Sequence, residues 1–128
     1  MRTTPNHRMN WIAFLFSFEG RISRSDYWLR FVTPFTIIFV AAVVAVDPLD
    51  FHKVMLPLTL AGLCLWVAPA VKRCHDRDRS GWFLLIFLVP WVGQLWLLIE
   101  LGFLRGTVGP NRFGPDPLAG VRELRSAP

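Results

Sequence analysis

Six formal charges and one histidine lie within the eight residues 72–79, whose sequence is KRCHDRDR. The central run, Cys74–Asp76, joins three residue types that bind metal ions. Consecutive residues of a helix point to different sides, however, and the only other histidines of the chain are His7 and His52. An adjacent His–Asp pair also occurs in metal-dependent phosphohydrolases, but those centres need more ligands than this chain supplies. We therefore expect no metal ion and no cofactor.

Other catalytic and binding patterns are also missing from the sequence. No serine has a plausible His–Asp set, no glycine-rich phosphate loop follows a strand pattern, and no paired carboxylates belong to a polar cleft. The net charge of +5 is compatible with binding to nucleic acid, but no nucleic-acid-binding motif accompanies it. We expect neither catalysis nor nucleic-acid binding, and we attribute the positive charge to membrane anchoring.

The segments on either side of the charged stretch explain this attribution. Hydrophobic residues make up 53% of the 128 residues, and no formal charge occurs in 31–46, 54–71 or 81–99. At about 1.5 Å of rise per residue, helices over 27–46, 54–71 and 81–104 can each cross a hydrocarbon core of about 30 Å. None of the three has the polar face that a helix of a soluble bundle needs. The sequence predicts an all-α integral membrane protein with three transmembrane helices.

The third of these segments is interrupted by the sequence PWVG, Pro90–Gly93. We favour one full span with a proline kink. The alternative is a re-entrant hairpin, in which each arm of about ten residues crosses only half of the bilayer. The choice decides on which side of the membrane residues 105–128 lie.

The distribution of basic residues predicts the orientation. Five lie in residues 1–30, one in the loop 47–53, four in 72–80 and four in the tail. Because positive charge is retained on the cytoplasmic side, the amino terminus and residues 72–80 are expected there, and three full spans then place the tail outside. The expected divisions are a cytoplasmic amino-terminal segment, 1–26, a membrane domain, 27–104, and a Gly/Pro-rich polar tail, 105–128.

Helix-capping patterns mark the ends of the expected helices. Thr4 and the proline after it predict the start of a short interfacial helix that stops before Gly20. Ser23 and Asp26 have the spacing of a capping box ahead of the first span. Ser80 occupies the same kind of position ahead of the third segment.

Two polar residues fall inside the third segment, Gln94 and Glu100. Glu100 is close to the end of that segment, and we expect it to reach the outer interface near His52 and Lys53, where it snorkels or forms a pair. The alternative is a role in an ion or proton pathway. For Gln94 we expect a hydrogen bond donated to a neighbouring helix.

Three blocks separated by apolar segments carry a family resemblance. In chain order they are FEGRISRSDYWLRF (Phe18–Phe31), KRCHDRDRSGW (Lys72–Trp82) and GTVGPNRFGPDP (Gly106–Pro117). Together they resemble the bacterial domain-of-unknown-function 805 family, over roughly residues 10–118. The resemblance implies a small, multi-pass protein of the bacterial inner membrane without an established activity.

Carried over position by position, the resemblance picks out polar, glycine, proline and aromatic residues of the three blocks. They are Gly20, Arg21, Ser23, Arg24, Trp28, Arg73, His75, Asp76, Ser80, Gly81, Trp82, Gly106, Gly109, Asn111, Arg112, Gly114, Pro115 and Pro117. The position of Cys74 is usually aliphatic in the family, so we expect no shared thiol chemistry.

The first two blocks suggest a network of ion pairs on the cytoplasmic face. Its expected members are Arg21, Arg24, Asp26, Arg73, His75, Asp76, Arg77, Asp78 and Arg79, with His75 available to bridge. One interpretation is that the network only fixes the helices relative to one another. The other is that surplus arginine binds anionic lipid headgroups or an acidic partner. The tail motif, Gly109, Asn111, Arg112 and Gly114, is a further candidate site.

We expect a non-catalytic membrane protein that interacts with a partner or with anionic lipid. Its expected partners are the lipid bilayer, anionic headgroups, and a membrane protein or further copies of the chain. The first alternative is a homo-oligomeric channel or transporter component whose pore is lined by Gln94 and Glu100. A membrane-embedded enzyme is the third possibility.

Overall fold

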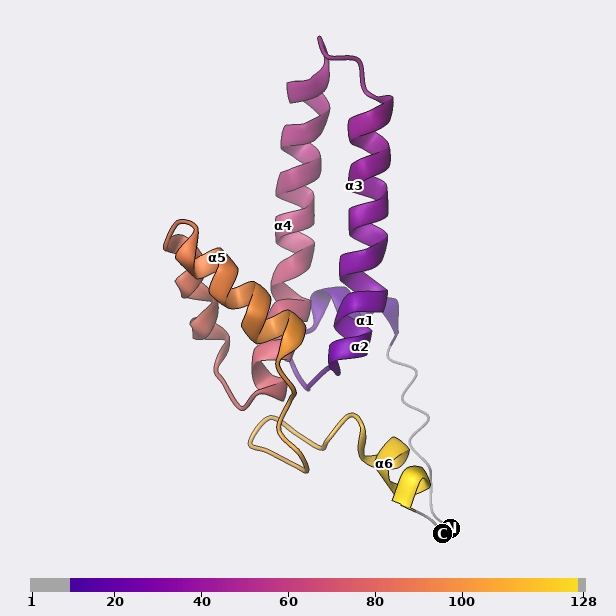
Figure 1. Ribbon diagram of the computed structural model, residues 1–128, viewed down its shortest axis with the longest axis vertical. Coiled ribbons are helices and arrows are strands. Elements are labelled where there is room, and N and C mark those ends of the chain that lie inside the picture. Colours follow the sequence, from indigo (N-terminus) through magenta and orange to yellow (C-terminus); the bar gives the residue numbers. More distant parts are fainter. Residues whose placement is uncertain (1–9, 127–128) are drawn as a thin grey trace.

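The computed structural model of the chain describes residues 10–126 (Figure 1). These residues form helices joined by loops, and within this range the only β-type pairing is an isolated bridge between Asn111 and Gly114. The prediction of an all-α fold is confirmed. Two long helices stand side by side, a shorter helical hairpin packs beside one of them, and the carboxyl-terminal tail lies below their lower end (Figure 1).

The first long helix is continuous but has three parts. They are α2 (Arg24–Tyr27), a π-helical turn η1 (Trp28–Val32) and α3 (Thr33–Ala45). Pro34 has no backbone N–H, which removes a helical hydrogen bond at the start of α3 and accounts for the widened turn before it. The Ser23 hydroxyl caps α2 by accepting the Asp26 N–H at 3.1 Å, as the capping-box pattern predicts.

The second long helix, α4 (Phe51–Asp76), runs antiparallel to α3. A Cβ atom at Gly62 would overlap the ring of Phe35, so the glycine lets the two helices approach closely. Both helices are long and apolar enough to cross a membrane, and only 6% and 28% of their apolar windows are buried. Such exposed apolar surface is unusual for the core helices of a soluble protein and suits contact with lipid.

The third expected span is not a single helix. A 3₁₀-helix, η2 (Gly81–Leu88), is followed by a tight turn, by α5 (Val92–Leu97) and by a π-helical end, η3 (Leu98–Phe103). The chain reverses at Trp91, whose φ is +62°, and the two arms return side by side (Figure 1). The prediction of one kinked helix over 81–104 is wrong, and the hairpin given as its alternative is the observed shape.

Two residues explain the reversal. Pro90 cannot donate a backbone hydrogen bond and so interrupts the helix. A Cβ atom at Gly93 would collide with the carbonyl oxygen of Ile86, so only glycine lets the two arms come together there. At about 2.0 Å per residue for the first arm and about 1.5 Å for the second, each arm is shorter than a hydrocarbon core of about 30 Å.

The expected amino-terminal helix is present in part. α1 (Trp11–Phe16) begins at Asn10, whose side chain accepts the N–H of Ile12 at 3.2 Å. The expected cap at Thr4 lies outside the described residues. α1 packs against α4 through Phe14, which is fully buried, while Trp11 and Ile12 are exposed.

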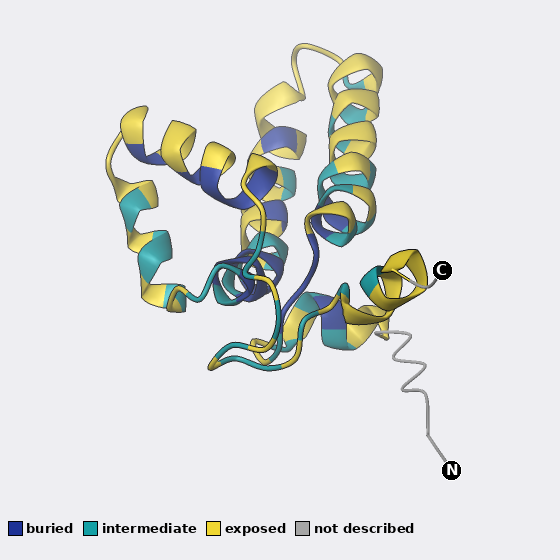
Figure 2. Cartoon of the chain, turned by 60° about the horizontal axis from the view of Figure 1, so that its bottom comes forward, coloured by how far each residue is buried: buried dark blue, intermediate teal, exposed yellow. Residues whose placement is uncertain are grey.

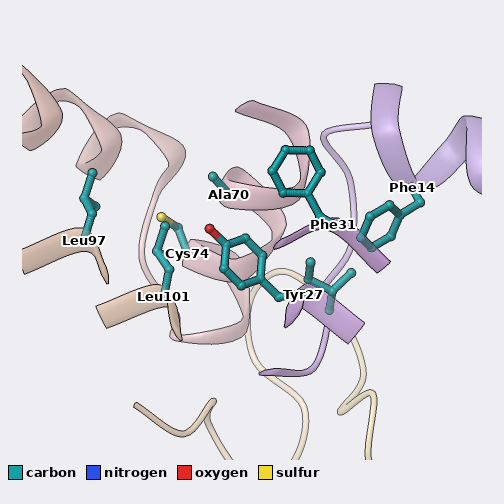
Figure 3. Close-up of a cluster of buried hydrophobic side chains, with 8 residues drawn as sticks. Phe14, Tyr27, Phe31, Ala70, Cys74, Leu97 and Leu101 are labelled. Carbon is teal, nitrogen blue, oxygen red and sulfur yellow. The ribbon is translucent and has the colours of Figure 1, made fainter. Parts of the chain in front are cut away.

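Most of the buried residues gather at one end of the molecule, although Met55 and Gly62 of α4 lie outside this region. Figure 2 shows them in the lower part of α4, in the segment before α2 and along α5 and η3. The core consists of Phe14, Ile22, Tyr27, Phe31, Ala70, Cys74, Leu97 and Leu101 (Figure 3). It therefore brings α1, α2, α4 and the hairpin together where the charged residues also meet. We call the surface formed by residues 20–30, 72–80 and 104–126 the charged end.

Candidate functional site

Two arginines and one aspartate form the centre of the charged end. Arg21 precedes α2, and Arg73 and Asp76 lie one turn apart at the end of α4. The Nη2 atom of Arg21 is 3.0 Å from Oδ1 of Asp76, and Nη1 of Arg73 contacts Oδ2 of the same carboxylate. All three residues are at most 5% exposed. The carboxylate thus neutralises only one of two buried guanidinium charges.

The guanidinium of Arg21 also holds the tail. It donates to the carbonyl oxygens of Thr107 at 2.7 Å, of Gly109 at 2.8 Å and of Gly114 at 3.2 Å. Together with Asp76 these acceptors engage all three of its nitrogen atoms. Arg21 therefore has a complete set of partners inside the protein.

Other arginines bond the last carbonyl groups of the hairpin. Arg73 donates to the carbonyl oxygen of Leu101 at 2.8 Å and to that of Leu104, while Arg24 donates to that of Phe103 at 2.9 Å. The last carbonyl groups of a helix have no N–H partner within the helix, so hydrogen bonds from nearby cations stabilise this end. The arginines of α2 and α4 thereby hold the returning arm of the hairpin against the core.

Glu100 joins this end and not the opposite one. It is 3% exposed, and its Oε1 atom lies 2.9 Å from Nε of Arg77 and 2.7 Å from Nε of Arg79. The expectation that Glu100 pairs near His52 and Lys53 is wrong, because the hairpin carries it back to the end of α4. Lys53 instead forms an exposed pair with Asp50.

Gln94, the other polar residue of the hairpin, is exposed and donates to the carbonyl oxygen of Phe87 at 2.8 Å. The acceptor belongs to η2, so the bond links the two arms.

In the part of the chain that the structure describes, His75 does not bridge an arginine and an aspartate. Its ring stacks on Phe113 with the centroids 4.0 Å apart, and Nδ1 is 3.2 Å from the carbonyl oxygen of Gly20. The histidine therefore joins the amino-terminal loop to the tail. Among residues 10–126, no group of three or more His, Cys, Asp or Glu side chains is placed to hold a metal ion.

The tail motif packs directly on the end of α4. The Asp76 carbonyl oxygen accepts the Thr107 N–H at 2.7 Å, and the Asn111 side chain donates to the His75 carbonyl oxygen at 2.8 Å. Arg112 donates to the Asp78 carboxylate at 3.1 Å. Three full spans would carry the tail to the opposite end of the molecule, whereas the hairpin returns it to the end that holds residues 72–80.

Asp116 organises the tail itself. Its carboxylate accepts the N–H of Gly109 at 3.0 Å and of Leu118 at 2.9 Å, and it pairs with Arg122 of α6 (Ala119–Ser126). Desolvation alone raises the pKa of this carboxyl group, but the two backbone hydrogen bonds and the charges of Arg122 and Arg21 outweigh it. The pKa of Asp116 is therefore lowered.

The expected network is divided into separate pairs. Asp26 accepts a hydrogen bond from the hydroxyl of Ser23, the residue that caps α2, and it pairs with Arg30 at 3.2 Å on a half-exposed surface. Asp78 pairs with Arg112, and Arg77 and Arg79 pair with Glu100. Of the nine expected members, all of which the structure describes, only Arg21, Arg73 and Asp76 share one buried cluster.

Sequence reasoning missed four residues of this end, Lys72, Thr107, Phe113 and Asp116. Lys72 is 1% exposed and donates to the carbonyl oxygens of Ala13 and Phe14, at 3.0 Å for the latter. α1 has no basic residue in its last turn, so its last carbonyl groups favour a cation from another element. This lack of a basic residue is one signal that could have pointed to Lys72. The GPDP sequence that contains Asp116 is a second one, since aspartate between prolines favours a turn.

The matched range of a known family covers nearly all of this arrangement. The family described as "Protein of unknown function (DUF805)" matches residues 15–115. The "Inner membrane protein YhaH" of Escherichia coli (strain K12) is 36% identical over 107 residues, which cover 78% of this chain and 86% of that protein. The "Inner membrane protein YhaI" of the same strain is 37% identical over 110 residues, covering 80% and 87%.

A third relative in that strain, "Uncharacterized protein YiiR", is 32% identical over 133 residues, covering 80% of this chain and 87% of that protein. No solved structure matches the chain. The chain belongs to the DUF805 family of proteins of unknown function.

Proposed function

We propose that this chain is a multi-pass inner-membrane protein that associates with anionic lipid through its charged end. The apolar, exposed faces of α3 and α4 support the membrane placement, as do the relatives named inner membrane proteins. The basic residues gathered at one end of these helices favour a cytoplasmic position for that end. The amino-terminal block and the tail then lie together at the cytoplasmic headgroup layer.

The observation that carries the proposal is the surplus of arginine over carboxylate at this end. The buried centre alone holds two arginines against one aspartate. Arg24, on the same surface, is exposed and bonds a backbone carbonyl oxygen without forming an ion pair among the described residues. Basic groups near an anionic leaflet each contribute about 1 kcal/mol of attraction.

The buried part of the network has a structural role in this proposal. Arg21 and Arg73 are fully enclosed and their donors are taken up by Asp76 and by backbone carbonyl groups. They are therefore not free to bind a headgroup. Association with lipid falls to the exposed arginines around them.

The test uses the full chain in nanodiscs of neutral lipid and in nanodiscs that contain phosphatidylglycerol, each melted at low and at high salt. We expect a higher melting temperature in the anionic discs, and we expect salt to reduce the difference. Equal melting temperatures in both kinds of disc at low salt would overturn the proposal. A variant with Lys53→Gln at the opposite end is the control and should keep the full lipid effect.

No observation favours the channel alternative over lipid association. It needed Gln94 and Glu100 to line a pore between copies, but Glu100 is buried between two arginines. The amide of Gln94 is bonded to the other arm of its own hairpin.

A further inference from the structure

A cavity of about 280 Å³ lies at the charged end, between α2, the loop 105–108 and α6. Its lining includes four arginines, Arg24, Arg105, Arg122 and Arg125, which come from these three separate segments. Small-molecule pockets start at roughly 300 Å³, so this volume fits a headgroup-sized ligand better than a large cofactor. The arginines line one cavity although Arg24 and Arg125 are 101 residues apart in the chain.

The positive charge around this cavity is not compensated inside the described part of the chain. The two carboxylates in its lining are already engaged: Asp76 pairs with Arg21 and Arg73, and Asp116 pairs with Arg122. Across residues 10–126, neither Arg24, Arg105 nor Arg125 forms an ion pair. All three are exposed, and apart from the bond that Arg24 donates from Nη1 to the Phe103 carbonyl oxygen their guanidinium nitrogens are available to a ligand.

Several guanidinium groups around one small space repel one another unless an anion lies between them. The planar fork of arginine matches the oxygen atoms of a phosphate group, to which it donates two parallel hydrogen bonds. A phosphate monoester carries about −1.5 to −2 charges at neutral pH, whereas a phosphodiester carries a single one. The more highly charged group is the better match for three uncompensated arginines.

The rest of the lining has a different character. Val108, Leu118 and Val121 line the cavity together with the arginines. An apolar wall beside a cationic one suits a ligand that joins a phosphate group to a hydrocarbon or glycerol portion. A phospholipid with a terminal phosphate has this composition.

We propose that this cavity is a binding site for a phosphate monoester group. The inference rests on the proposed function, because the cavity belongs to the charged end, but it adds selectivity for one headgroup chemistry. The group comes either from a lipid of the phosphatidic acid type or from a free phosphate-bearing molecule. Arg24, Arg105 and Arg125 bind its oxygen atoms, and Arg21 and Asp76 hold the loop 105–108 in place behind it.

The experiment compares three kinds of nanodisc that hold the full chain: neutral lipid alone, with phosphatidylglycerol, and with phosphatidic acid at equal total negative charge. A fourth sample adds inorganic phosphate to neutral discs, against sodium chloride at the same ionic strength. We expect the largest rise in melting temperature with phosphatidic acid, with inorganic phosphate, or with both. Stabilisation by phosphatidic acid but not by inorganic phosphate identifies lipid as the source. Stabilisation by inorganic phosphate as well shows that a soluble phosphate is sufficient.

The double variant Arg105→Gln/Arg125→Gln tests the cavity directly, since both side chains are exposed and their loss leaves no buried group unpaired. We expect its affinity for the phosphate monoester to fall about fivefold for each arginine removed. The matched control, Arg30→Gln/Arg112→Gln, removes the same charge outside the cavity lining and should keep the selectivity.

The outcomes separate this inference from the proposed function. Equal stabilisation by phosphatidic acid and phosphatidylglycerol, without an effect of inorganic phosphate, overturns the monoester site and leaves general lipid association standing. Stabilisation by inorganic phosphate without any effect of anionic lipid overturns the proposed function and keeps the site. An equal loss of selectivity in the control variant also overturns the site, because charge anywhere at this end would then suffice.

Discussion

Arg21 and Asp76 are 55 residues apart in the chain, and their side chains meet at 3.0 Å in a buried ion pair. The pair joins the loop before the first long helix to the last turn of the second one. Because Arg73 contacts the same carboxylate, a single aspartate holds two buried guanidinium groups. The tail is bound in turn by Arg21, so the integrity of the charged end depends on Asp76.

Replacing Asp76 by alanine should therefore destabilise the protein strongly. Breaking a buried pair by removing one partner costs about 3–5 kcal/mol, because the remaining charge is left uncompensated. The control is Asp47→Ala, which removes an exposed carboxylate from the loop between the long helices. Thermal unfolding in detergent should show a clearly lower melting temperature for Asp76→Ala than for Asp47→Ala, and similar values for the two would refute this role.

Gly106 lies against the carboxylate of Asp76, and a Cβ atom at this position would overlap it. Gly106→Ala should shift either the loop or the carboxylate, at a cost of about 1–3 kcal/mol. Gly120→Ala is the matched control, because a Cβ atom there meets open space and alanine favours the helix. Urea unfolding that gives equal midpoints for both variants would show that the tail does not pack on Asp76.

The sequence sufficed for the features that depend on neighbouring residues. The long apolar stretches around Ile37 and Leu63 predict the two long helices. The spacing of Ser23 and Asp26 predicts the cap at the start of the first one. Such signals are local, because helix periodicity and capping act within one or two turns.

The partners of Glu100 and of the tail could not be predicted in the same way. They depend on whether the chain reverses at Pro90, and proline is compatible with both a kinked helix and a turn. The deciding feature is the contact between Gly93 and the Ile86 carbonyl oxygen, which requires the hairpin to exist already. One undecided turn thus reversed the expected position of every residue after it.

Acid should loosen the tail through Asp116. The pKa of this carboxyl group is lowered in the folded protein, so its contribution to stability is complete above the unfolded-state value of about 3.9. The contribution is lost as the pH falls through the folded-state pKa. Between neutral and strongly acidic pH, the melting temperature should fall less for Asp116→Asn than for the wild type. An equal fall in melting temperature for the two proteins would contradict this role.

The hairpin makes a prediction about membrane sides that differs from three full spans. Residue 78 lies in the turn that follows α4 and residue 120 lies in α6, and both are at the end opposite the loop that contains Asp50 (Figure 1). Single cysteines at positions 50, 78 and 120, with Cys64 and Cys74 replaced by alanine, report their accessibility. In intact cells an impermeant thiol reagent should label position 50 alone, and positions 78 and 120 should react once the membrane is opened. Labelling of position 120 at the rate of position 50, with position 78 protected, would mean that the third segment crosses the membrane and that the tail leaves the charged end.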